Sequence, residues 1–159
     1  MYNKKLFAFI LLIMFILPFQ GTCSNEFSLN PPKAVEGMLD LSQWQLEEKV
    51  IRLDGEWEFY WGQLLEPREL EETNIQRDGY IDLPSSWNHY IINDKELSGY
   101  GYATYRLLFK TKEGGRLSIR LPRIFTSYNL WVNEKLIATA GTVGRSRETM
   151  TPQYLPQVV

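Results

Sequence analysis

The segment "GYGYATYRLLFKT", residues 99–111, decides the fold of this chain. It begins with alternating glycine and tyrosine, and its apolar side chains then recur at every second residue, as in a β-strand with one buried face. We expect the strand to be scaffold and the segment before it to lie at a rim where a ligand binds. One face of the strand carries Ala103, Tyr105, Leu107 and Phe109, and the other carries Thr104, Arg106 and Lys110, with Leu108 as an apolar exception.

The same alternation returns at short intervals along the chain. Trp57, Phe59 and Trp61 alternate with Glu58 and Tyr60. The preceding pair Asp54-Gly55 predicts either a tight hairpin or a strand broken by a glycine bulge. Further short strands are expected within residues 35–46, 79–84, 117–121, 128–132 and 135–139.

Short strands at this spacing, each with one apolar face, predict an all-β protein built as an antiparallel β-sandwich. We expect the rows through Trp57, Tyr105, Ile119 and Val132 to face one shared interior. Residues 64–73 hold the one short helix that the sequence allows, because Pro67 suits a first helical turn and glutamates follow it.

The N-terminus has the layout of a targeting segment. Lys4 and Lys5 precede an apolar run of fourteen residues, which is shorter than the roughly 20 residues of a membrane-spanning helix. Residues 1–23 are therefore expected to be a secretory signal peptide, with an uncleaved membrane anchor as the alternative. Residues 24–34 are expected to be an extended linker, and residues 35–159 a β-sandwich domain that is truncated at its C-terminus.

Cys23 is the only cysteine and lies in the expected cleavage region. It is either a lipid-attachment site or a residue near simple cleavage. The absence of a leucine-like residue three places before it favours simple cleavage. In both cases the exported domain has no cysteine pair, so its stability comes from packing and not from disulfides.

Composition and charge limit the function. The formal net charge is −2, and it becomes −4 without residues 1–23, which hold two lysines and no acidic residue. No basic patch points to nucleic acid as a partner. His89 is the only histidine, and we expect it to face solvent in a loop. We expect no catalytic residue, no metal site and no cofactor.

Aromatic residues are the remaining functional signal. An exposed tryptophan or tyrosine offers a flat apolar plate beside a polar group, which suits sugar rings. Trp87 is also suited to plug one end of the sandwich, and Trp131 fits a core position as well as a contact position. The candidate ligand-binding residues are Trp87, Asn88, Tyr100, Tyr102, Asn129 and Trp131, with the two asparagines as hydrogen-bonding groups.

An ordered set of motifs carries a family resemblance. The motifs are "GMLDLS" (37–42), "IRLDGEWEFYWGQLL" (51–65), "LPSSWN" (83–88), "GYGYATYRL" (99–107) and "SYNLWVNEKLIATAGTVG" (127–144). In this order they resemble the extracellular sensor domain of bacterial seven-transmembrane receptors with diverse intracellular signalling modules. The resemblance covers residues 35–159. It implies a jelly-roll sandwich, similar to carbohydrate-binding modules, that is tethered to the membrane through seven downstream helices and signals through a cytoplasmic output domain.

Three of the stretches also resemble the non-catalytic sugar-binding domain of glycoside hydrolase family 2. In that family a glycine usually follows the Trp-Val-Asn strand, whereas this chain has Glu134. Glutamate resists the positive φ of a tight primed turn, so we expect this hairpin to open into a longer loop.

The resemblance and the aromatic residues leave three functions open. The first is an extracytoplasmic sensor domain that binds a carbohydrate or another small ligand and has no catalysis of its own. The second is the sugar-binding module of an exported glycoside hydrolase. The third is an envelope protein-interaction module without a small ligand.

Overall fold

The computed structural model describes residues 30–44, 50–72, 74–112, 117–122 and 124–159. The expected signal peptide and Cys23 lie outside these ranges. Within them the fold is all-β, as predicted, with several antiparallel pairs. The helix expected in residues 64–73 is only a 3-10 turn, η1 (Glu69–Glu71), because so short a segment gains too few hydrogen bonds to continue.

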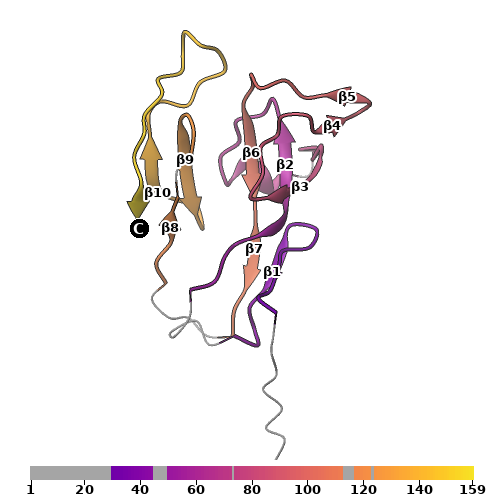
Figure 1. Ribbon diagram of the computed structural model, residues 1–159, viewed down its shortest axis with the longest axis vertical. Coiled ribbons are helices and arrows are strands. Elements are labelled where there is room, and N and C mark those ends of the chain that lie inside the picture. The colour runs from indigo at the N-terminus through magenta and orange to yellow at the C-terminus, as the bar shows by residue number, and fades with distance from the viewer. Residues whose placement is uncertain (1–29, 45–49, 73, 113–116, 123) are drawn as a thin grey trace, which may run out of the picture.

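A three-stranded sheet forms the centre of one half of the molecule (Figure 1). β2 (Gly55–Trp61) lies between β3 (Gly79–Leu83) and β6 (Ala103–Arg106), and both neighbours are antiparallel to it. Phe59 faces Tyr105 across one pair, and Trp57 faces Ile81 across the other. The register therefore brings the apolar rows of these strands onto the same side of the sheet.

The strand expected from residues 103–110 divides at Leu107. Its second part, β7 (Leu108–Lys110), leaves the central sheet and pairs with β1 (Met38–Asp40). This pair is parallel, which corrects the expectation of antiparallel pairing throughout. A parallel pair needs a long connection between its strands, and here that connection contains all three strands of the central sheet.

The Asp54-Gly55 pair makes neither a tight hairpin nor a bulge within a strand. Residues 51–54 form no strand, and β2 begins at Gly55, whose φ is 112°. A Cβ at Gly55 would lie 2.4 Å from the carbonyl oxygen of Ala34. Glycine is required here because the N-terminal segment crosses the start of β2 at backbone contact distance. Ala34, at the end of the expected linker, is consequently buried.

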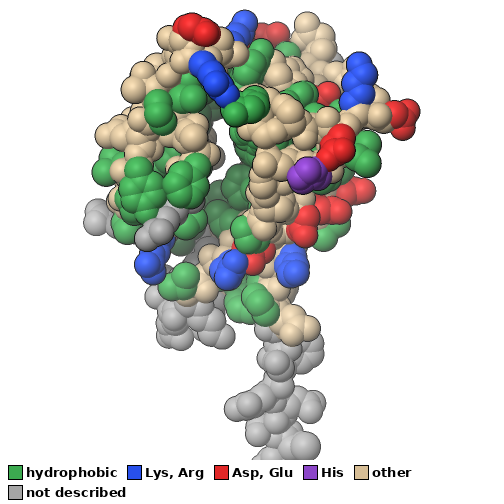
Figure 2. Space-filling view, turned by 45° about the horizontal axis from the view of Figure 1, so that its top comes forward, with side chains coloured by type: hydrophobic (Ala, Val, Ile, Leu, Met, Phe, Trp, Pro, Cys, Tyr) green, Lys and Arg blue, Asp and Glu red, His purple; other side chains and the backbone are tan. Residues whose placement is uncertain are grey.

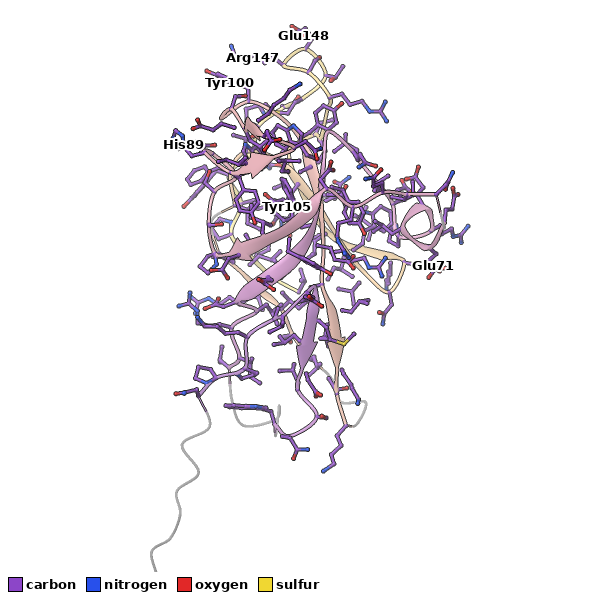
Figure 3. The ribbon with its side chains drawn as sticks, turned by 90° about the vertical axis from the view of Figure 1, so that its right-hand side faces the viewer. Glu71, His89, Tyr100, Tyr105, Arg147 and Glu148 are labelled. Carbon is purple, nitrogen blue, oxygen red and sulfur yellow. The ribbon has the colours of Figure 1, made fainter. Side chains whose placement is uncertain are left out.

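The C-terminal strands form a separate group that lies across from the central sheet (Figures 1 and 3). β9 (Tyr128–Val132) and β10 (Lys135–Ala140) make an antiparallel hairpin. Beside it, β8 (Arg120–Leu121) pairs with β11 (Gln157–Val158). Figure 2 shows a hollow between the two halves, with hydrophobic side chains along its walls. The arrangement is sandwich-like, with two groups of strands facing each other.

The turn between β9 and β10 is tight, so the expected longer loop is wrong. Asn133 and Glu134 have φ values of 46° and 64°, and Val132 pairs directly with Lys135. Asparagine tolerates this region, and strand pairing on both sides holds Glu134 in it. The Glu134 carboxylate lies 3.8 Å from Nε of Arg68 beside η1, an exposed pair that adds little stability.

Within the described residues, the apolar side chains around the central sheet and β1 form two clusters and not one shared interior. Phe59 and Ile81 are completely buried in the first, and Tyr105 packs against it. Leu39 is completely buried in the second, and Trp57 packs against that one. The division coincides with the change of sheet at Leu107, because Leu107 packs against the second cluster beside Leu39 of β1, whereas the three residues of β7 are exposed. Ile119 and Val132 are half-buried and belong to neither described cluster.

On the second face of β2, Glu58 and Tyr60 are buried although their side chains carry polar groups, whereas Glu56 is exposed. Glu58 is 8% exposed and accepts a hydrogen bond of 3.0 Å from Nη1 of Arg77. Nε of Arg106 lies 3.1 Å from Oε2 of Glu58 as an ion pair without hydrogen-bond geometry. Tyr60 donates a 2.9 Å hydrogen bond to the same oxygen. Burial, together with the Glu58 carboxylate, raises the pKa of Tyr60 to about 12.

Candidate functional site

Residues 85–102, which we call the rim loop, were expected to be an irregular loop but contain a small hairpin. β4 (Ile91–Ile92) and β5 (Lys95–Glu96) pair across Asn93 and Asp94, whose φ values are 50° and 60°. A two-residue turn with two positive φ values matches the twist of a hairpin, and asparagine and aspartate tolerate it. Two apolar residues of this loop, Ile92 and Leu97, are buried in the first core cluster. The rim loop is therefore anchored to the sheet.

Trp87 packs as a plug at the base of the rim loop. Its ring meets Trp61 edge-on, with the ring centroids 5.5 Å apart and the planes at 68°. Its Nε1 donates a hydrogen bond of 3.1 Å to the carbonyl oxygen of Ser98. Trp87 is half-buried against the first cluster, so its ring supports the loop more than it faces solvent.

Of the two glycines in "GYGY", only Gly101 is required by the packing around it. A Cβ on Gly101 would lie 2.0 Å from Cη2 of Trp61, well inside van der Waals contact. A Cβ on Gly99 would come no closer than 3.4 Å to the Asn88 amide, an ordinary contact. Gly101 therefore lets the chain pass directly over the Trp61 ring, whereas Gly99 is not sterically required.

We expect Gly101→Ala to lower the free energy of unfolding by about 1–3 kcal/mol, because the rigid Trp61 ring is held between Phe59 and Trp87 and has little room to move. Urea unfolding followed by tryptophan fluorescence measures this effect. Gly99→Ala is the matched control and should change stability by less than about 0.5 kcal/mol. Equal stabilities of the two variants would show that the loop does not press on Trp61.

Tyr100 is the most exposed aromatic residue of the rim loop, with 74% of its surface accessible. The guanidinium carbon of Arg147 lies 4.3 Å from the centroid of its ring. Figure 3 shows both residues at the same end of the molecule, with His89 on the same side. Asn88 is exposed, and its amide lies beside Gly99, the residue before Tyr100. Tyr102 is half-buried, and its carbonyl oxygen accepts a 2.9 Å hydrogen bond from Gly62.

The other two candidates lie on β9, in the opposite half of the molecule. Asn129 is exposed and pairs with Thr139, and Trp131 is half-buried opposite Leu136. Among the hydrogen bonds, ion pairs and ring contacts of the described residues, none joins Asn129 or Trp131 to the rim loop. Trp87, Asn88, Tyr100 and Tyr102 thus lie on the rim loop, whereas Asn129 and Trp131 lie on β9.

His89 and the two serines near it in the sequence have different partners. Nδ1 of His89 pairs with Oε1 of Glu96 across the small hairpin, and both side chains are exposed. Ser85 Oγ donates to the carbonyl oxygen of Asp82, and Ser86 Oγ accepts a 3.3 Å hydrogen bond from the Asn88 backbone. Neither serine contacts the imidazole, so these residues form no nucleophile–base pair. In the described ranges no group of three or more potential metal ligands is present.

Comparisons with protein-family models, with curated proteins and with solved structures find no match to this chain. The search for membrane-spanning helices, which covered the described residues, finds none that is long and apolar enough to cross a bilayer.

Sequence reasoning missed two features of the structure. The contact of Arg147 with Tyr100 joins segments that are far apart in the chain, and no local pattern indicates it. The burial of Glu58 was hidden because its alternation with Trp57 and Phe59 is typical of a solvent-facing residue. The two positively charged partners, Arg77 and Arg106, come from other strands or their approaches, so only strand pairing identifies them.

Proposed function

We propose that this chain is the extracytoplasmic, ligand-binding sensor domain of a membrane signalling receptor, with a jelly-roll fold and a carbohydrate as its ligand. The observation that carries the proposal is the rim loop, an anchored loop on which Tyr100 and Asn88 are both exposed to solvent. The ordered motifs and the all-β, sandwich-like fold support the sensor-domain assignment. Export and tethering to the membrane belong to the same proposal.

The anchored loop favours binding of a small ligand over a purely structural role. Ile92 and Leu97 hold the rim loop on the core, so little conformational entropy is lost when a ligand docks. A sugar stacks on the exposed part of the Tyr100 ring in this proposal, and the exposed Asn88 amide offers both donors and an acceptor on the same loop.

A saccharide screen tests this function. The purified protein is melted in the presence of neutral and acidic oligosaccharides, and affinities of the hits are measured by calorimetry. Tyr100→Ala is expected to weaken binding by about 10- to 100-fold, because the variant removes the apolar plate that the sugar covers. Tyr154→Ala, which removes a half-exposed tyrosine outside the rim loop, is the matched control and should bind normally.

Two results would contradict the proposal. If no saccharide stabilises the protein, the carbohydrate assignment fails. If saccharides bind but Trp131→Ala abolishes binding while Tyr100→Ala does not, the ligand site lies on β9 and not on the rim loop.

A further inference from the structure

Tyr100 and Arg147 meet where two loops come together at one end of the molecule (Figure 3). Tyr100 belongs to the rim loop, and Arg147 belongs to the loop of residues 142–151 that follows β10. The 4.3 Å separation places the guanidinium group over the face of the ring, where the negative ring surface attracts the cation. The stack is a contact between the half of the molecule with the central sheet and the half with β9 and β10.

The loop that carries Arg147 is held by its own hydrogen bonds. Thr142 and Thr151 exchange two backbone hydrogen bonds of 2.8 and 3.0 Å, which close the base of the loop. Ser146 donates its N–H to Oγ1 of Thr149 at 3.1 Å, and its carbonyl oxygen accepts a hydrogen bond from Met150 at 3.0 Å. Arg147 therefore extends from a closed loop whose backbone geometry is set before any ligand arrives.

The positive charge of Arg147 has no carboxylate partner in the described part of the chain. The adjacent carboxylate, Glu148, interacts with Ser146 instead, and a hydrogen bond from that side chain lowers the pKa of Glu148. A guanidinium group that is stacked by its face keeps the N–H groups of its edge free. These N–H groups lie in one plane and match the two oxygens of a carboxylate.

We propose that Arg147 and Tyr100 form a subsite for an acidic saccharide, in which the Arg147 guanidinium binds a carboxylate on the sugar and the exposed part of the Tyr100 ring contacts the sugar itself. This inference rests on the proposed carbohydrate-binding function and names the class of sugar. The ring orients the guanidinium group, and the guanidinium group distinguishes a uronate from a neutral sugar of the same shape.

The protein as a whole is slightly acidic, so binding of an acidic sugar depends on the local positive charge of Arg147. The formal net charge of the chain is −2, which does not favour anionic ligands in general. Charges separated by more than about 10 Å are largely screened at physiological salt, so an arginine in direct contact outweighs the distant acidic groups. Arg145 adds a second positive charge on the same loop.

Calorimetry with uronate oligosaccharides and their methyl esters tests the subsite. The probes are oligogalacturonides and alginate oligosaccharides, each measured beside its methyl ester, and a sulfated galactan measured beside the unsulfated galactan. Methyl esterification removes the charge and keeps the sugar, so the free acid should bind about 10- to 100-fold more tightly. Arg147→Gln should abolish that preference, whereas Arg145→Gln, with the same loss of charge on the same loop, should keep it.

Each alternative result has a definite meaning. Equal binding of acids and esters overturns the inference and leaves the carbohydrate-binding proposal in place. A preference for the sulfated galactan without binding of the uronates overturns the carboxylate assignment. Equal losses in Arg145→Gln and Arg147→Gln overturn the role of the stack, because charge alone would then account for binding. If none of these probes binds, this inference fails, and the saccharide screen described above decides separately whether the proposed function fails with it.

Discussion

Phe59→Ala is expected to lower the free energy of unfolding by about 3–5 kcal/mol, the largest effect of any single truncation that we predict. Phe59 is completely buried at the centre of β2. Its ring lies 5.1 Å from the ring of Tyr105 and 6.3 Å from that of Tyr90, measured between centroids. Removing it leaves a cavity that these rigid rings cannot fill, and the cavity adds to the loss of apolar burial.

Urea unfolding of the variant and of a matched control measures this effect. Phe125→Ala removes the same atoms from a residue that is 72% exposed, so it should change stability by less than about 1 kcal/mol. If the two variants unfolded at the same urea concentration, the first core cluster would not be the main source of stability. Trp87 and Trp61 pack beside Phe59, so the tryptophan fluorescence of the folded variant should also change.

Glu58→Gln is expected to lower the free energy of unfolding by about 2–4 kcal/mol. The substitution keeps the shape of the side chain and removes the negative charge between Arg77 and Arg106. Both arginines would then lose their carboxylate partner in a partly buried site, where water replaces it poorly. The hydroxyl of Tyr60 would also donate to a weaker, neutral acceptor.

A charge-matched control separates this network from the general charge of the protein. Glu71→Gln removes one negative charge from an exposed position of η1 and should leave stability within about 0.5 kcal/mol. Arg106→Gln combined with Glu58→Gln should restore part of the loss, because the double variant removes both members of one ion pair. A loss of stability that is equal for Glu58→Gln and Glu71→Gln would contradict a buried network.

Local alternation predicted the strands well and their partners poorly. Tyr105 was predicted correctly to be a core residue, since it packs against Phe59 on the same face of the central sheet, and β3, β9 and β10 form close to the expected residues. The same alternation placed Trp57 and Tyr105 in one interior, whereas they contact different clusters. Alternation reports which side of a strand is apolar, and it holds no information about where a strand leaves one sheet for another, as the chain does at Leu107.

The candidate site was also predicted only in part from the sequence. Aromatic residues in a long segment between strands identified the rim loop, and Tyr100 is exposed there. Sequence reasoning treated Glu134 as an obstacle to a tight turn, but pairing of Val132 with Lys135 holds it at positive φ. Turn preferences are worth about a kilocalorie per mole or two, and tertiary pairing can exceed them.

The sequence by itself determined that the protein is all-β, where most of its strands lie, and which loop holds a group of aromatic residues. These properties depend on the two-residue period of the strand and on residue type, and both can be read locally. Tertiary structure alone decided the burial of Glu58 between two arginines and the stacking of Arg147 on Tyr100. Those contacts join residues from distant parts of the chain, and they exist only once strand pairing has brought their segments together.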